Sequence, residues 1–464
     1  VQALLWRSRA PLDARYMPGC RHVLASAGVL RRRLSSDAVA APAARGLSSC
    51  SSAAAAAADV ARLFEEEIRA PTPRLLRAFL EVQQLRGLTA LAPDDSSTAT
   101  AGLHPLIVPL ARGVGSDGEE IVQGVMRMPP SVAMGGDFCW PLVEASVQGT
   151  RCAADQPVPP LTQCLRSNCA SAAHSPVHHY RLLAQDPAMH VNRIAAEADA
   201  ASDPLGAEIS RVLEQERASS GEQGGFIYVP GSAPRLDGEA KAPLKLRAFL
   251  LTKIGMFPDL LQLLSAEHLR RGDQTAAAVA SARAADCHFG WGTGYWHQAK
   301  LMAVCGNSAR AREQASAALH CPFSTLLDTV DDGLGPLPLV SDDPGGFNGR
   351  VPELQRIGAI AEMRYDDLVE SCHKRAQDKK SQEMKQGLSW PAQAAELRAV
   401  GLLDTAVVEG VPWPSLLKDS LPRELVEAEL PGLASLANVR LSAAQAATAS
   451  AGTAAASESV AATV

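Results

Sequence analysis

Apolar positions at helical spacing recur along most of the chain and predict a mainly α protein. Leu75, Leu76, Phe79 and Leu80 illustrate the pattern, because side chains three or four residues apart share one face of a helix. Asp203-Pro204 adds a helix-start signal, with proline in the first turn. The pattern predicts helices over residues 58–69, 74–85, 177–184, 189–201, 205–218, 244–254, 352–376, 391–403 and 416–429.

One part of the N-terminal half predicts β-structure instead. Residues 106–110 form a short apolar run, turn residues follow it, and residues 121–128 alternate between apolar and polar. A third strand is expected over 142–147 and a further short strand over 226–229. We therefore expect a small antiparallel β-element within a helical protein.

Two glycines 34 residues apart, Gly272 and Gly306, mark a repeated unit within residues 258–323. Alanines follow both glycines at the same two offsets: Ala277 and Ala284, then Ala311 and Ala318. This period with small residues at these places resembles the tetratricopeptide repeat, a helix–turn–helix unit that stacks on its neighbours. The resemblance implies that each glycine forms a turn, that the alanines let helices approach closely, and that flanking helices cap the pair. His268 and Met302 depart from the repeat, since an aromatic residue is usual there, and a generic helical bundle is the alternative.

Members of that family bind other proteins in a groove lined by the first helix of each unit. The positions that resemble groove residues here are Gln262, Thr293, Trp296, His297 and Lys300. Only Lys300 fits the basic clamp of the chaperone-binding subset, so we do not expect recognition of a chaperone tail. The resemblance implies a groove for a peptide or a partner helix, although Trp296 would equally suit packing between repeats.

A second resemblance concerns residues 106–110, 121–130 and 250–259. These segments are similar to segments of a group of uncharacterised organellar proteins of plants and algae, in which a short β-containing region precedes a tetratricopeptide-like pair. The similarity implies an organellar location and carries no activity.

The N-terminal residues differ in charge from the rest of the chain. Residues 1–57 hold eight arginines, no lysine and two acids, a net charge of +6, whereas the remaining residues carry −12. An arginine- and serine-rich, acid-poor segment is typical of an organellar transit peptide for a mitochondrion or a plastid; an ordinary disordered N-terminus is the alternative. We expect a transit segment over 1–57, a mixed α/β region over 58–220, a linker over 221–243, the repeat domain over 244–330, a linker over 331–350, C-terminal helices over 351–440 and a disordered tail over 441–464.

Composition narrows the classes of partner. An acidic chain lacks the basic surface that non-specific nucleic-acid binding needs, so we do not expect nucleic acid. No run of 18 apolar residues is present, so we expect a soluble protein without a membrane span. The ten cysteines include no CxxC pair, which favours free thiols.

Candidate chemistry is confined to one region rich in cysteine and histidine. Its members are Cys152, Cys164, Cys169, His174 and His178. The residue types suit zinc, but no closely spaced ligand pair begins a site. We expect no metal and no cofactor, and a Cys/His-dependent enzyme, with or without zinc, is the alternative.

These patterns together favour a non-catalytic protein. We expect a protein–protein interaction scaffold, an assembly factor or a peripheral subunit of an organellar complex, whose partners are other proteins. Besides the Cys/His-dependent enzyme, an RNA-associated helical repeat factor is a third possibility, against which the acidic charge argues.

Overall fold

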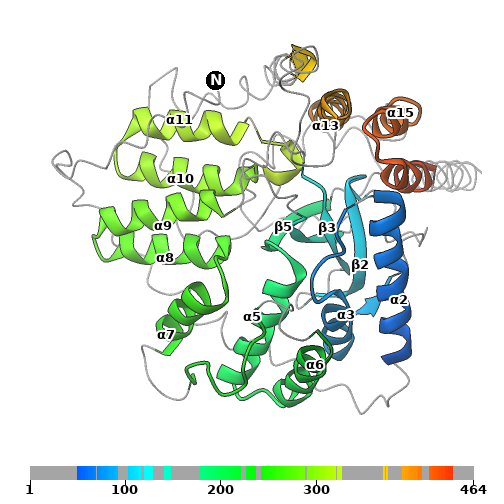
Figure 1. The fold of residues 1–464 in the computed structure, drawn as a ribbon. Helices are drawn as coiled ribbons and strands as arrows, with labels where there is room; N and C mark the ends of the chain where they lie inside the picture. The colour runs from blue at the N-terminus through cyan, green and yellow to red at the C-terminus, as the bar shows by residue number, and fades with distance from the viewer. Residues whose placement is uncertain are drawn as a thin grey trace, which may run out of the picture.

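A computed structural model describes residues 50–68, 70–91, 103–115, 120–128, 140–147, 178–220, 226–236, 242–287, 290–319, 321–326, 369–370, 372–374, 389–409 and 417–442. These residues form a mainly helical protein with one five-stranded antiparallel sheet in the N-terminal half (Figure 1). The fold class expected from the sequence is therefore confirmed. None of the described helices combines the length and the apolar character needed to cross a membrane.

The first helix begins earlier than the sequence suggested. Helix α2 spans Cys50–Arg62 and continues into the π-helical turn η2, Leu63–Ile68. Ala53, Ala56 and Ala57 are buried in the main core, so residues 53–57 belong to the folded body and not to the segment that was set apart from it. Alanine explains the extension, because it has the highest helix propensity and lets the helix lie close to its neighbours.

The sheet contains five strands in sequence order. They are β1 Thr89–Ala90, β2 Ile107–Val114, β3 Glu120–Met126, β4 Leu142–Val147 and β5 His178–Ala184. Strands β2, β3 and β4 match the three expected ones, whereas the helix expected over 177–184 is wrong. This segment pairs with β4 instead, where Tyr180 lies opposite Ala145 and Leu182 opposite Val143.

Each face of the sheet is buried in a different cluster. Val108, Leu110 and Val125 point into the main core with the helices. Ile107, Val122 and other side chains of the opposite face form a second cluster, which also contains Trp291 from the repeat region. Burial on both faces explains why β2 begins with a continuous apolar run instead of an alternating one.

Helices α2, α3, Leu76–Leu85, and α5, Pro187–Ala200, pack against strands of the sheet (Figure 1). Helix α6, Leu205–Ser220, packs against both α3 and α5. Asp186 caps α5, since its carboxylate accepts a hydrogen bond from the Met189 amide.

Residues 226–236 pack against the helices, although sequence analysis placed a short strand and part of a linker there. Tyr228 is fully buried, and its amide donates to Asn192 Oδ1 at 2.6 Å. Arg217 Nη2 donates to the Tyr228 carbonyl at 2.9 Å, and the Tyr228 hydroxyl bonds to the Asp199 carboxylate. Side chains thus satisfy the backbone groups that a strand would have paired, and the strand prediction is wrong.

The repeat region forms a stack of helices beside the sheet (Figure 1). It consists of α7 Ala242–Phe249, η4 Leu250–Ile254, α8 Pro258–Arg270, α9 Gln274–Asp286, α10 Gly292–Val304, α11 Ser308–Leu319 and the 3-10 turn η5 Phe323–Leu326. Helices α8 and α9 form one hairpin, α10 and α11 form the next, and α9 packs on α10. This is the helical hairpin pair expected from the 34-residue period.

The C-terminal helices return to the sheet. They are α13 Trp390–Glu409, α15 Ser420–Glu427 and a helix over residues 431–442. Their apolar side chains, among them Leu397, Leu425 and Leu433, share the main core with α2 and α3. The regions 58–220 and 351–440 therefore do not have separate cores, and residues 441–442, expected in the tail, are helical. Residues 331–350 and most of the helix expected over 352–376 lie outside the described residues.

Candidate protein-binding site

The two hairpins of the repeat region turn in the same way. Gly272 and Gly306 adopt φ values of +81° and +76°, a left-handed conformation that favours glycine. The amide of the residue after each glycine bonds five residues back, Asp273 to the His268 carbonyl at 3.0 Å and Asn307 to that of Met302 at 2.9 Å. This is a Schellman helix end.

Asp273 and Asn307 also stand at the start of the second helix of their hairpins. Asp273 Oδ1 accepts from the Ala276 amide at 2.9 Å, and Asn307 Oδ1 accepts from the Arg310 amide at 3.2 Å. Each therefore caps a helix N-terminus, so the turn chemistry is repeated over 34 residues together with the spacing.

Small residues fill the contacts within and between the hairpins. Ala277, Ala284, Ala311 and Ala318 are all buried. Gly294, in the first turn of α10, lies so close to α9 that an added Cβ would stand 2.8 Å from the Ala285 Cα. The helices approach this closely because no larger side chain separates them.

The positions expected to line a groove do not form an open one throughout. Gln262 and His297 are only 5% and 1% exposed, so neither can contact a partner in this arrangement. Thr293 Oγ1 donates to the Thr325 carbonyl of η5 at 2.7 Å, while Trp296 and Lys300 are half-buried in α10. The spacing of residues along the sequence does not reveal that these positions are buried by other parts of the chain.

An ion-pair network joins the first hairpin to the sheet and α5. Asp259, in the first turn of α8, receives two hydrogen bonds from Arg193 of α5, at 2.9 and 2.7 Å, and Arg181 of β5 lies 3.8 Å away. Arg193 also donates to Glu197 and stacks over the Phe257 ring, 4.8 Å from its centroid. Such a bidentate pair fixes both position and orientation.

The opposite charges of Asp259 and Arg193 stabilise each other at this junction. Burial alone would raise the pKa of Asp259, but the charge and hydrogen bonds of Arg193, with a smaller effect of Arg181, outweigh it and hold the pKa below its ordinary value. Burial likewise opposes the charge of Arg193, and Asp259 and Glu197 outweigh it and raise its pKa. Both groups therefore stay charged across the neutral range.

A second junction joins the end of β3 to the C-terminal helices. Arg127 Nε donates to Glu396 Oε1 of α13 at 2.6 Å, and both side chains are buried. The guanidinium also lies over the Trp140 ring, whose edge-to-face partner is Phe64 of η2. On the helix over 431–442, Arg440 Nη1 donates to the His104 carbonyl at 3.0 Å.

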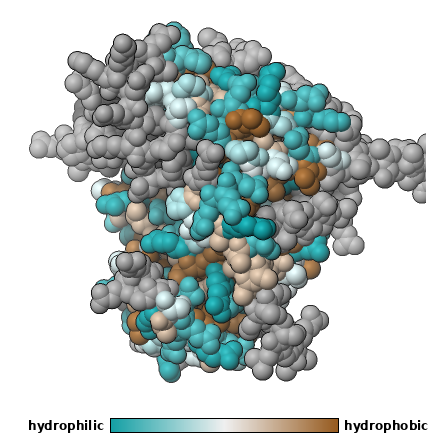
Figure 2. All heavy atoms as spheres, turned by 45° about the vertical axis from the view of Figure 1, so that its right-hand side comes forward, coloured by the Kyte–Doolittle hydropathy of each residue, from teal (hydrophilic) through white to brown (hydrophobic). Residues whose placement is uncertain are grey.

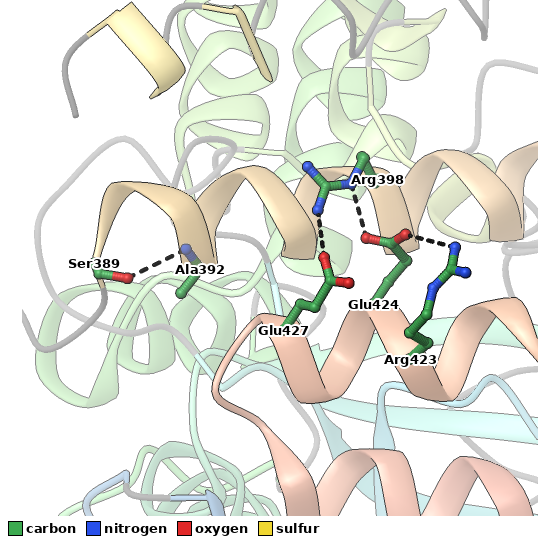
Figure 3. Close-up of polar contacts among 6 residues, drawn as sticks. All are labelled: Ser389, Ala392, Arg398, Arg423, Glu424 and Glu427. Atoms are coloured by element: carbon green, nitrogen blue, oxygen red, sulfur yellow. Dashed lines mark hydrogen bonds and ion pairs between the residues drawn. The ribbon is translucent and has the colours of Figure 1, made fainter. Parts of the chain in front are cut away.

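Helices α13 and α15 are held together on their outer side by ion pairs (Figure 3). Arg398 Nε donates to Glu424 Oε2 at 2.7 Å and its Nη2 to Glu427 Oε2 at 2.9 Å. Arg423 approaches the other oxygen of Glu424 at 3.5 Å, and Ser389 accepts from the Ala392 amide at the start of α13. The Arg193–Asp259 and Arg127–Glu396 junctions are both polar and well paired. The sheet, the repeats and the C-terminal helices therefore form a pre-organised body.

The described surface offers scattered apolar side chains. In Figure 2 hydrophobic residues lie in separate groups among hydrophilic ones. The exposed large hydrophobic residues of the described part are spread over five separate segments, two of them within residues 226–229: Val114, Phe226, Val229, Val279, Val426 and Val439. Recognition on the described residues is therefore better served by charge than by one apolar face.

Most of the metal candidates cannot be placed. Cys152, Cys164, Cys169 and His174 lie outside the described residues, and His178 begins β5. Within the described ranges, no group of three or more His, Cys, Asp or Glu side chains could hold a metal ion.

The charged residues that join the parts of the fold carry no signature in the sequence. Asp259 and Arg193 were not singled out, nor were Arg127 and Glu396, because partners 66 and 269 residues apart leave no local pattern. An acidic residue in the first turn of α8, directly after Pro258, was the available signal for Asp259, but that position equally suits the helix dipole.

Comparison with known proteins adds two matches. The family model described as "PAB middle domain" matches residues 258–334, which begin with α8 and include both hairpins. The tetratricopeptide resemblance therefore stays a prediction. No solved structure gives a significant match.

A curated relative matches a larger share of the chain. It is the Arabidopsis thaliana protein named "Protein IN CHLOROPLAST ATPASE BIOGENESIS, chloroplastic", 25% identical over 358 residues, which are 76% of this chain and 83% of the relative. Because the match is longer than the repeat region, the chain is similar to this chloroplast protein in most of its length.

Proposed function

We propose that this protein is an assembly factor for a plastid ATPase and that it acts by holding other proteins. The observation that carries the proposal is the similarity to a chloroplast ATPase biogenesis protein over 358 residues. The arginine- and serine-rich N-terminal residues, with a net charge of +6, are consistent with import into a plastid.

The fold suits such a role because it is held rigid at both of its polar junctions. Arg193–Asp259 fixes the repeats to α5, and Arg127–Glu396 fixes the C-terminal helices to the end of β3. A surface that is already ordered loses little conformational entropy when a partner binds. The factor would thus offer a fixed template to an ATPase subunit and release it unchanged, without chemistry of its own.

The test is recovery of the tagged full-length chain from plastids under mild conditions. We expect subunits of the plastid ATPase to co-purify in fixed proportion, and more strongly when assembly of the complex is under way. The comparison variant carries Asp259→Asn alone, which takes the buried Arg193 guanidinium's bidentate partner away and should loosen the repeats from α5 and reduce recovery. Recovery of a chain free of ATPase subunits would overturn the proposal.

A further inference from the structure

Two arginines pair with one carboxylate at the end of α8, and a third arginine stands on α7. Arg271 Nε and Nη2 lie 3.0 and 2.8 Å from Glu267 Oε1, and Arg270 Nη1 contacts Oε2 of the same group. Arg247 of α7 lies within electrostatic range of both Glu267 and Arg270. We call Arg247, Glu267, Arg270 and Arg271 the arginine face.

Within the part of the chain that the structure describes, Arg247 is the member of the face that forms no hydrogen bond. It makes no hydrogen bond or ion pair with another residue of the described ranges, although its guanidinium is partly removed from water. Burial, and then the charge of Arg270, lower the pKa of Arg247 despite the attraction of Glu267 and Asp259. A half-buried guanidinium of this kind presents its donors in a planar fork that is complementary to a carboxylate.

The arginine face differs in charge from the rest of the protein. Residues 242–271 contain five basic and two acidic residues, a net charge of +3, within a chain of net charge −6. Arg270 and Arg271 have side chains that are 42% and 53% exposed. The face is therefore accessible as well as positive.

We propose that the arginine face docks an acidic, carboxylate-rich segment of a partner protein. A carboxylate can accept two parallel hydrogen bonds from a guanidinium, which adds direction to the attraction. Glu267, at the centre of the face, would repel a continuous polyanion, whereas a protein segment with spaced carboxylates can place a neutral or basic residue opposite it. The chemistry thus favours an acidic protein segment over RNA. This proposal rests on the proposed function in one respect: the protein that supplies the acidic segment is taken to be an assembly partner.

The direct test is fluorescence anisotropy with the full-length chain. The probe is a labelled helical peptide with paired glutamates four residues apart, and its twin carries glutamine at those places. We expect Arg247→Gln to weaken binding of the acidic peptide about tenfold or more, and Arg271→Gln to weaken it less. Arg211→Gln on the exposed face of α6 removes the same charge and should leave binding unchanged.

Folding and binding effects separate cleanly in this design. Because burial opposes the charge of Arg247 more than Glu267 and Asp259 favour it, Arg247→Gln should melt at the wild-type temperature or slightly above it, so weaker binding would not reflect unfolding. Equal binding of the acidic and glutamine peptides, or equal loss with Arg247→Gln and Arg211→Gln, overturns the proposal. Tighter binding of an RNA oligonucleotide of matched charge overturns it too.

The same variants separate this proposal from the proposed function. If the wild-type chain binds the acidic peptide through Arg247 but recovers no ATPase subunit from plastids, the proposed function fails and the docking face stands. If the wild-type chain recovers ATPase subunits and Arg247→Gln recovers them equally well, the docking face fails and the proposed function stands.

Discussion

Breaking the buried Arg127–Glu396 pair should be among the most damaging single changes in the described core. The Arg127 and Glu396 side chains are 3% and 0% exposed, and the pair joins the end of β3 to α13 across 269 residues. Glu396→Gln keeps the shape of the side chain but removes the carboxylate that pairs with the buried Arg127 guanidinium. Removing one partner of a buried pair typically costs about 3–5 kcal/mol.

Arg398 supplies the matched control on the same helix. It also pairs with glutamates, but its side chain is 35% exposed, so solvent screens the interaction. We expect Arg398→Gln to lower the free energy of unfolding by roughly 0.2–1 kcal/mol. Urea unfolding followed by circular dichroism would measure both variants, with the urea dependence checked for a constant slope.

A double variant tests the reasoning further. Arg127→Met with Glu396→Leu removes both charges and fills a similar volume, so it should regain most of the stability that Glu396→Gln loses. Equal losses for Glu396→Gln and Arg398→Gln would refute the argument from burial. A double variant less stable than Glu396→Gln would refute the argument that an unpaired charge is the cause.

Four further changes should have measurable effects on unfolding. Gly272→Ala should cost about 1–2 kcal/mol through its left-handed backbone alone, and Gly294→Ala about 1–3 kcal/mol through collision with α9; thermal melts would compare them. Asp259 has a lowered pKa in the folded chain. Its contribution to the free energy of unfolding is therefore complete above its ordinary pKa of 3.8 and is lost as the pH falls through the pKa of the folded state. Asp259→Asn should therefore be less stable at pH 7 and lose less on further acidification, as urea titrations at several pH values would report. His190 is held neutral by burial and by nearby arginines, which lower its pKa well below 6.5, so stability should fall below about pH 6.5 by up to about 1.4 kcal/mol per pH unit; His190→Phe should remove that share of the slope.

Local patterns predicted much of the fold. Strands β2, β3 and β4 were recognisable because apolar runs and turn residues alternate there over short distances. The hairpins of the repeat region were recognisable because Gly272 and Gly306 recur with the same neighbours. In both cases the interactions that decide the structure lie within a few residues of one another.

Other elements are decided by distant parts of the chain. Strand β5 holds Leu182, Leu183 and Ala184 in a row, an order that fits a helix as well as a strand buried on both faces, and its pairing with β4 decides between them. Residues 226–229 have strand-forming side chains, but their backbone groups form hydrogen bonds with the side chains of Asn192 and Arg217.

The candidate site was predicted less well than the fold. Spacing placed Gln262 and His297 on a groove, yet packing within the chain buries both. The arginine face was not expected, because Arg247 and Glu267 are 20 residues apart and an overall negative charge conceals a local positive one. Charge averaged over a long chain says little about a single face.

The central claim, assembly of a plastid ATPase, is tested most directly by pulse-labelling plastids that lack this protein and resolving their complexes on native gels. The account predicts that ATPase subunits are synthesised at the normal rate but accumulate as free subunits or partial complexes, and that the wild-type chain restores assembly. Assembly of the complete ATPase at the wild-type rate in its absence would contradict the account.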